Sequence, residues 1–307
     1  MRKALLLYNP LSGGRRERRL ADVEAAARVL REAGVETSIS PTQGAARAQE
    51  QTQHAIAEGI DTIFACGGDG TIHDLLQVMV GTTATLGIIP LGTGNTLAHD
   101  VCLPLTPVAA AKAALRAQPR RIPVGKVEYQ DFSGNRVSAY FTVTVGIGVD
   151  AHLFYHLDPQ AKRRFGMTSY YSKATWLWLT HPLEHFEAQI NGADRAAVSQ
   201  LLAVRIRNFG GVLRELAPGA SLERQNLRLV LFRTRSRIAY LRYIIRSLFG
   251  AKWKVGDIDL IDADRLECRA LPNMQNPRVF VEADGELLGT LPAEISIVPD
   301  AFYLLMP

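Results

Sequence analysis

Cysteine and long apolar runs are both scarce in this 307-residue sequence. The three cysteines, Cys66, Cys102 and Cys268, lie far apart and form no CxxC pair, which argues against a disulfide framework. We therefore expect reduced thiols and a cytoplasmic location. The basic start of the chain is followed by an apolar run that ends at Tyr8, which is too short for a signal peptide. No run reaches the roughly 18 apolar residues of a spanning helix, so any contact with the inner membrane face is expected to be peripheral.

Strong charge bias, internal repeats and low-complexity linkers are missing as well. Hydrophobic residues make up 47% of the chain and charged residues 21%, which is typical of a globular protein and not of a disordered one. The formal net charge is +5. This small basic excess suits an acidic partner, such as a polyphosphate nucleotide or an anionic membrane surface, and it gives no indication of nucleic acid binding.

The first third of the chain alternates strand-like and helix-like segments. Strands are predicted at Ala4–Tyr8, Val35–Ser40, Asp61–Cys66 and Thr85–Ile89, and helices at Arg16–Arg31, Ala45–Glu58 and Thr71–Val80. In the first helix, the apolar face is assigned to Leu20, Val23, Ala27 and Leu30. This order predicts an α/β domain over residues 1–121, with a parallel sheet and helices on both of its faces.

From about residue 122 the pattern becomes mainly β. Strands are predicted at Arg121–Tyr129, Arg136–Val145, Glu184–Ile190, Ser199–Ile206, Leu227–Phe232, Ile258–Ile261, Arg265–Ala270, Val279–Ala283 and Glu294–Val298, and helices at about Arg163–Leu179 and Ile238–Phe249. We expect a β-sandwich domain over residues 122–298. A last strand at Ala301–Leu305, within residues 299–307, is expected to return to the first domain.

Three turns follow strands of the predicted parallel sheet. They are Asn9–Gly14, the GGDGT run Gly67–Thr71 and the PLGTGN run Pro90–Asn95. Open α/β sheets bind ligands at the carboxyl ends of their strands, and glycines let the backbone approach a phosphate closely. One such turn is explained as well by simple chain reversal, but three at successive strands indicate a phosphate site. Neither GxxxxGK[ST] nor GxGxxG occurs, which argues against a Walker loop and a nicotinamide-linked reductase.

Charged residues accompany these turns. Asp69 lies inside the GGDGT run, where its carboxylate would repel a phosphate unless a divalent cation lay between them. We therefore predict that Asp69 contacts Mg²⁺ directly or through water. The first turn is followed by Arg15, Arg16, Arg18 and Arg19. Because acidic residues are interleaved with these arginines, most of them are expected to form a solvated helix face.

The ordered motifs resemble the diacylglycerol kinase catalytic-domain superfamily, which includes bacterial diacylglycerol kinases, sphingosine kinases and ceramide kinases. The resemblance is carried by Asn9-Pro-x-Ser-Gly, the GGDGT run, the PLGTGN run and Asp284-Gly285-Glu286. NAD kinases share GGDGT, whereas PLGTGN is more specific to the lipid kinases. The resemblance implies a nucleotide domain similar to that of NAD kinase, a C-terminal β-sandwich for the lipid acceptor, and ATP in a cleft between the two.

The resemblance also implies roles for individual residues. The ATP site would be lined by Asn9, Ser12, Gly67, Gly68, Asp69, Gly70, Thr71, Gly92, Thr93, Gly94 and Asn95. Asp284 would be the general base, with Glu286 beside it in the catalytic cluster. Read from the residues alone, Asp284-Gly285 is a hairpin turn, and a turn that presents the carboxylate satisfies both interpretations.

Three sites depart from the family pattern, and the mildest is Asp74, which stands where glutamate is common. Thr96 stands where an aspartate is usual. Gln225-Asn226 stands where Asp-Gly is expected, in a segment whose acidic residues hold a structural Mg²⁺ in some bacterial members.

A basic and aromatic segment follows later in the chain. From Phe232 to Lys254 there are seven basic residues and no acidic ones, with Tyr240, Tyr243, Phe249 and Trp253 among them. This pattern suits a helix on an anionic membrane, and it also suits a core-facing helix with a solvated basic side. Similar alternatives hold for Lys162–Phe165 and the aromatic residues after it, which could line an acyl-chain pocket or fill the core.

Two histidine pairs have the i, i+4 spacing that a metal site can use. They are His152 with His156 and His181 with His185. Neither pair carries the HExxH pattern, and no cysteine cluster accompanies them. We therefore expect structural or surface histidines.

The sequence thus predicts an ATP- and Mg²⁺-dependent lipid kinase that phosphorylates a hydroxyl of a lipid such as diacylglycerol or a sphingoid lipid. One alternative is a NAD kinase, which shares GGDGT and the two-domain plan. The other is a non-catalytic nucleotide-binding protein, which the departures at Thr96 and Gln225-Asn226 suggest. The expected partner is a lipid substrate at an anionic membrane surface, without nucleic acid, and a homodimer is left open.

Overall fold

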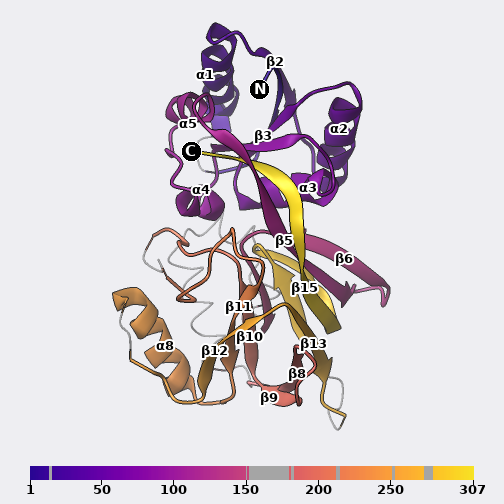
Figure 1. Cartoon of the computed structure of the whole chain (residues 1–307), viewed down its shortest axis with the longest axis vertical. Coiled ribbons are helices and arrows are strands. Elements are labelled where there is room, and N and C mark those ends of the chain that lie inside the picture. Colours follow the sequence, from indigo (N-terminus) through magenta and orange to yellow (C-terminus); the bar gives the residue numbers. More distant parts are fainter. Residues whose placement is uncertain are drawn as a thin grey trace. The chain divides into compact units, whose positions relative to one another are not determined.

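The computed structural model in Figure 1 describes residues 1–13, 16–149, 151, 180, 183–211, 215–250, 253–272 and 279–307. The chain divides into two compact units. The first comprises Met1–Val124, Asn208–Gly211 and Val298–Pro307, and the second comprises Gly125–Arg207 and Val212–Ile297. The predicted helix at Arg163–Leu179 lies outside the described residues.

Strands and helices alternate along the first unit. In chain order they are β1 (Lys3–Tyr8), the 3-10 helix η1 (Arg16–Arg18), α1 (Arg19–Glu32), β2 (Glu36–Pro41), α2 (Ala45–Ala57), β3 (Thr62–Gly67), α3 (Asp69–Met79), β4 (Thr85–Pro90), α4 (Thr96–Asp100) and α5 (Pro107–Ala114). The strands pair in the order β2-β1-β3-β4, and all of these pairs are parallel. The end of β15 (Glu286–Met306) lies parallel to β4, with Tyr303 opposite Thr85. The C-terminal part of β15, from Val298 on, therefore belongs to the first unit.

Helices cover both faces of this sheet, as the parallel pairing requires. Helices α1 and α5 pack against each other, and α2 packs against α3. Figure 1 shows the two pairs on opposite sides of the sheet. The core beneath α1 and α5 is built from alternate strand residues and small helix residues, including Ala4, Leu6, Val23, Ala27, Leu30, Phe64, Cys66, Ile89 and Ala110.

The first helix differs from its prediction in both its start and its buried face. Residues 16–18 form a 3-10 turn, and α1 begins at Arg19. The residues that α1 buries are Arg19, Val23, Ala26, Ala27 and Leu30. That helical spacing passes through position 19, so Leu20 points away from the core and is 47% exposed.

The second unit is built mainly from antiparallel strands. They are β5 (Gln118–Gln130, which starts in the first unit), β6 (Arg136–Phe141), β7 (Thr144–Gly148), β8 (Phe186–Ile190), β9 (Ala196–Val198), β10 (Gln200–Val204), β11 (Leu227–Phe232), β12 (Ile258–Ala263), β13 (Arg265–Ala270), β14 (Phe280–Ala283) and the first part of β15. One layer has the order β12-β11-β10-β7-β14-β15, while β5, β6, β13, β8 and β9 pair off this path. A single core joins the layers, with Phe141, Ile147, Phe186, Leu229 and Val281 fully buried in it. The predicted mainly β second part is confirmed.

One predicted strand of this unit is interrupted. Residues 136–145 form two strands, β6 and β7, separated at Thr142 and Val143. The backbone N–H groups at this break donate to a side-chain carboxylate instead of a neighbouring strand. In contrast, the segments 294–298 and 301–305 belong to one continuous strand, β15.

The second unit also carries the helix α8 (Arg237–Phe249), close to the predicted bounds. It begins after Ser236, whose hydroxyl accepts a hydrogen bond from the N–H of Ala239, and ends at Gly250 in the left-handed conformation. Within the described ranges, no helix is long and apolar enough to cross a membrane.

Candidate active site

The three predicted phosphate loops lie at one edge of the first unit's sheet because they follow adjacent parallel strands. Asn9 follows β1, Gly67 ends β3, and Leu91 follows β4. Backbone hydrogen bonds join the loops: the N–H of Asn9 donates to Cys66 O at 3.3 Å, and that of Leu91 donates to Gly67 O at 2.8 Å. The structure thus brings together residues that the sequence placed in three separate motifs.

Glycine contacts set how closely the loops approach one another. A Cβ atom on Gly92 would overlap the Gly68 Cα and lie 3.1 Å from the Gly68 nitrogen. Gly13 has a φ of 63°, and a Cβ atom there would lie 2.5 Å from the carbonyl oxygen of Leu91. Because no side chain fits at these positions, the loops form a cradle of bare backbone. Such a cradle suits a phosphate, which backbone amides can approach directly.

Asn95 shapes the PLGTGN loop from within. It adopts the left-handed conformation with a φ of 50°, which asparagine tolerates better than most residues. Its Oδ1 accepts from the N–H of Gly92 at 2.8 Å, and its Nδ2 donates to Gly92 O at 3.0 Å. Thr93 and Gly94 are left exposed at the tip of the loop. The buried Asn95 side chain therefore holds the loop, while its tip is accessible to a ligand.

A buried arginine supports the first loop. Asn9 Oδ1 accepts from the N–H of Leu11 at 2.8 Å, and the N–H of Ser12 donates to Asn9 O at 3.1 Å. The guanidinium of Arg19, at the start of α1, donates to Ser12 O. Burial lowers the pKa of Arg19, and the charge of Asp22 opposes this shift. In the sequence, Arg19 does not differ from its solvated neighbours, and only the phase of α1 identifies it as buried.

Asp69 lies at the start of α3 and is half-buried beneath the third loop. Its Oδ1 accepts from the N–H of Leu97 at 3.2 Å. A Cβ atom on Gly94 would lie 3.0 Å from Asp69 Oδ2, so this carboxylate reaches the exposed tip of the PLGTGN loop. Gly70 and Thr71 form the first turn of α3. A single carboxylate beside a phosphate cradle fits Mg²⁺, which takes most of its ligands from water and substrate phosphates.

Asp284 and Gly285 form the turn between β14 and β15 in the second unit. Their φ values are 51° and 85°, and two positive φ angles are typical of a type I′ hairpin turn. The predicted hairpin turn is confirmed. Glu286 is the first residue of β15 and is exposed. Glu282, which the sequence reasoning missed, is buried in β14 and accepts from the N–H of Gly285 at 3.0 Å. The signal in the sequence that could have identified Glu282 is an acidic residue within the otherwise apolar strand β14.

The carboxylate of Asp284 is held by backbone donors at the break between β6 and β7. Oδ2 accepts from the N–H of Thr142 at 2.9 Å, and Oδ1 accepts from the N–H groups of Val143 at 2.8 Å and Thr144 at 3.1 Å. Burial lowers the pKa of Arg205 to about 10, although the charge of Asp284 opposes that shift. Asp284 thus has a structural role in joining three strands, which the sequence did not indicate.

Arg205 supports the segment in which Gln225 departs from the family pattern. The side chain is fully buried. Its Nη1 donates to Arg224 O at 2.7 Å and Asn226 O at 3.3 Å, and its Nη2 donates to Leu222 O at 2.7 Å. The guanidinium therefore supplies positive charge and hydrogen-bond donors to this loop. Among the residues that the structure describes, no three His, Cys, Asp or Glu side chains are grouped to hold a metal ion.

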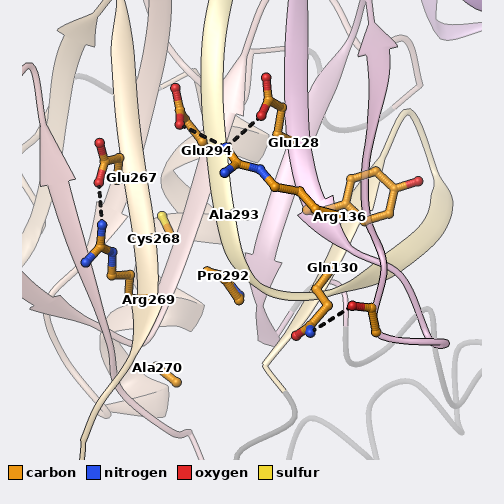
Figure 2. Close-up of a pocket in the computed structure, with 12 residues that line it drawn as sticks. Glu128, Gln130, Arg136, Glu267, Cys268, Arg269, Ala270, Pro292, Ala293 and Glu294 are labelled. Carbon is orange, nitrogen blue, oxygen red and sulfur yellow. Dashed lines mark hydrogen bonds and ion pairs between the residues drawn. The ribbon is translucent and has the colours of Figure 1, made fainter.

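A pocket of about 500 Å³ opens on β5, β6, β13 and β15 of the second unit (Figure 2). Ion pairs line its walls. Arg136 contacts Glu128 at 2.7 Å and Glu294 at 3.5 Å, and Arg269 contacts Glu267 at 3.1 Å. Because these carboxylates face arginines, the walls are close to neutral. Neither Asp284 nor Glu286 lines this pocket, so the pocket is not part of the candidate site.

The segment Lys162–Phe165, the aromatic residues that follow it, and three of the four paired histidines (His152, His156 and His181) lie outside the described residues. His185 is described, and burial, followed by the charge of Arg235, lowers its pKa.

A parallel α/β sheet with three backbone-lined loops, followed by a β-sandwich, defines the two-domain kinase class that the motifs suggested. Residues 3–127 match the diacylglycerol kinase catalytic domain, and residues 143–306 match the YegS C-terminal NAD kinase beta sandwich-like domain. The chain therefore belongs to the diacylglycerol kinase family, which is a family of kinases.

Named relatives and solved structures agree with this assignment. The diacylglycerol kinase of Mycobacterium tuberculosis H37Rv is 29% identical, over 99% of this chain and 95% of that protein. The diacylglycerol kinase of Bacillus subtilis is 27% identical, over 100% and 97%. A diacylglycerol kinase structure from Bacillus anthracis aligns with a TM-score of 0.71 at 20% identity, over 99% of this chain and 97% of that chain. Yeast NADH kinase aligns with a TM-score of 0.53 at 13% identity, over 100% and 84%. Both structures share the fold, and the predicted fold class is confirmed.

Proposed function

We propose that this chain is an ATP- and Mg²⁺-dependent lipid kinase that transfers the γ-phosphate to a hydroxyl of a lipid such as diacylglycerol. The assembled cradle of loops in the first unit carries the proposal. At Gly68 and Gly92 the loops approach so closely that no Cβ atom fits between them, so they meet as bare backbone, which a phosphate can approach from outside. The relatives described above are diacylglycerol kinases, which supports a lipid acceptor.

The first unit is proposed to bind the nucleotide. Backbone N–H groups of Gly68–Thr71 lie at the start of α3, where the partial positive charge of the helix favours a phosphate. Asp69 is the residue proposed to hold Mg²⁺, which when bound neutralises phosphate charge. Asn9, Ser12 and the exposed Thr93 complete the proposed lining of the site.

Asp284 is proposed as the general base, with Glu286 beside it. Its carboxylate accepts three backbone hydrogen bonds, which fix its position. Phosphoryl transfer tolerates a weak base because the proton leaves the attacking hydroxyl late in the reaction. The lipid hydroxyl would donate to a carboxylate oxygen in addition to these contacts, or in place of one of them.

A lipid panel tests the proposal. Purified chain is incubated with labelled ATP and Mg²⁺ and with diacylglycerol, monoacylglycerol, sphingosine or ceramide in detergent, and NAD⁺ serves as the competing acceptor. We expect labelled phosphate on at least one lipid and none on NAD⁺, and EDTA should abolish transfer. If the folded protein binds ATP but labels no lipid, the proposal is wrong. Labelled NADP⁺ would identify a NAD kinase instead.

A further inference from the structure

Helix α8 presents an apolar face to solvent. Ile238 is 71% exposed and Phe249 is 78% exposed, at opposite ends of the helix. Between them, the exposed large side chains are Leu241, Ile244, Ile245 and Leu248, and Trp253 follows beyond the helix end. Their spacing of three and four residues places them on one side of the helix. An amphipathic helix of a globular protein usually turns such a face inward, so this outward face needs a partner.

The inner side of α8 is fixed to the second unit by two tyrosines. The Tyr240 hydroxyl lies 2.8 Å from Ser199 Oγ, and the Tyr243 hydroxyl donates to Leu216 O at 2.6 Å. Both rings pack on Phe232, with centroids 4.3 and 5.3 Å away. These buried hydrogen bonds set the rotation of the helix about its axis. The apolar side therefore cannot turn inward without breaking them.

Exposed basic residues lie within α8 and on either side of it in the sequence. Arg235 and Arg242 are exposed, and so is Lys254. No acidic residue occurs between Phe232 and Lys254. Apolar side chains bordered by arginine, with a tryptophan and a phenylalanine at one end, suit the boundary between anionic lipid headgroups and acyl chains. A second copy of the chain fits less well, because a two-fold contact through α8 would bring these positive charges together.

From this geometry we infer that the exposed face of α8 is the surface by which the protein docks on an anionic lipid bilayer. The helix has 13 residues, too few to span a bilayer, so it lies in the plane of the interface with its apolar side chains among the upper acyl chains. The inference rests on the proposed lipid kinase function, because docking would bring the enzyme to its lipid substrate. Docking itself is measured without any turnover.

Vesicle sedimentation of the full chain tests the docking surface. The variant L241Q/I245Q/L248Q removes three apolar side chains that are 37–47% exposed. Its matched control is L105Q/V108Q/L115Q, which alters side chains with the same range of exposure in the first unit. Wild type and control are expected to bind phosphatidylglycerol vesicles. The α8 variant should bind them at least about tenfold more weakly, because partition into the bilayer follows the apolar area that is buried there.

Charge is tested with the same assay. Phosphatidylcholine vesicles should bind wild type more weakly than phosphatidylglycerol vesicles, and R235Q/R242Q should lose that preference, as should wild type in high salt. The inference is overturned if wild type binds neither vesicle, or if the α8 variant binds as wild type does. It is also overturned if light scattering shows a dimer that only the α8 variant dissociates, without vesicle binding.

Two failures remain distinguishable. Wild type that binds vesicles but phosphorylates no lipid contradicts the proposed function and leaves docking intact. Wild type that phosphorylates lipid in detergent but binds no vesicle contradicts docking and leaves the function intact. If both hold, the ratio of activity on vesicles to activity in detergent should fall about tenfold in the α8 variant relative to the control variant.

Discussion

Gly92 and Gly68 leave no room between their loops for even one methyl group. An alanine at position 92 would push its Cβ against the backbone of Gly68, which cannot move aside as a side chain would. Such overpacking costs about 1–3 kcal/mol, so Gly92→Ala should weaken ATP binding about tenfold or more. Titration calorimetry measures this. Gly256→Ala is the control, because a Cβ atom there meets open space. Equal ATP affinity in both variants would remove the glycine contact from the nucleotide site.

The buried guanidinium of Arg205 is expected to stabilise the folded chain through the carbonyl groups to which it donates. In Arg205→Met, the carbonyl groups of Leu222, Arg224 and Asn226 lose their donors. The bond to Leu222 O is buried and the other two are partly buried. An unpaired buried acceptor costs about 1–3 kcal/mol, so we expect the free energy of unfolding to fall by about 3 kcal/mol over the three groups. Urea denaturation measures the change. The exposed Arg207→Met should stay within about 0.5 kcal/mol of wild type. An Arg205→Met variant as stable as wild type would show that residues 222–226 keep their conformation without the guanidinium.

At the scale of elements, the turn between β14 and β15 combines a structural and a proposed chemical role. Asp284→Asn keeps a residue that tolerates a positive φ but replaces one carboxylate oxygen by an amide donor. It therefore loses the acceptor for at least one of the N–H groups of Thr142–Thr144, and we expect about 1–3 kcal/mol of lost stability. We also expect no lipid phosphorylation, with ATP affinity nearly unchanged. Glu286→Gln, at an exposed position, should keep wild-type stability. An unstable Asp284→Asn variant with full activity would contradict the base assignment.

The sequence predicted best the elements whose signal is local. Strands β1, β3 and β4 are short buried apolar runs, and they lie within one residue of their predicted bounds. Strands β3 and β4 end at Gly67 and Pro90, and β1 ends two residues before Pro10. Helix α5, Pro107–Ala114, was missed because its alanine-rich sequence has little apolar periodicity. The phosphate loops were predicted for the same local reason. Their mutual contacts were not.

Long-range contacts account for the remaining differences. Asp284 binds backbone groups 140–142 positions earlier in the chain, and nothing in its own neighbourhood indicates those partners. Arg19 and Arg205 are buried, yet in the sequence each looks like its exposed neighbour. The outward apolar face of α8 was equally hidden, because the sequence shows that a helix is amphipathic but not which side packs inward. That side was decided by Tyr240 and Tyr243.

At the scale of the whole molecule, the two proposed ligands should protect different units from hydrogen exchange. A ligand stabilises the structure that binds it, and amide exchange reports that gain segment by segment. A nonhydrolysable ATP analogue with Mg²⁺ should slow exchange in residues 9–13, 67–71 and 91–95, and Asp69→Asn should remove the part that depends on Mg²⁺. Phosphatidylglycerol vesicles should slow exchange in residues 237–249 instead. The variant L241Q/I245Q/L248Q should lose only the second effect, and Gly92→Ala should weaken only the first. If vesicles protected the loops while α8 exchanged freely, the lipid surface would lie on the nucleotide unit, and the division of roles between the two units would be wrong.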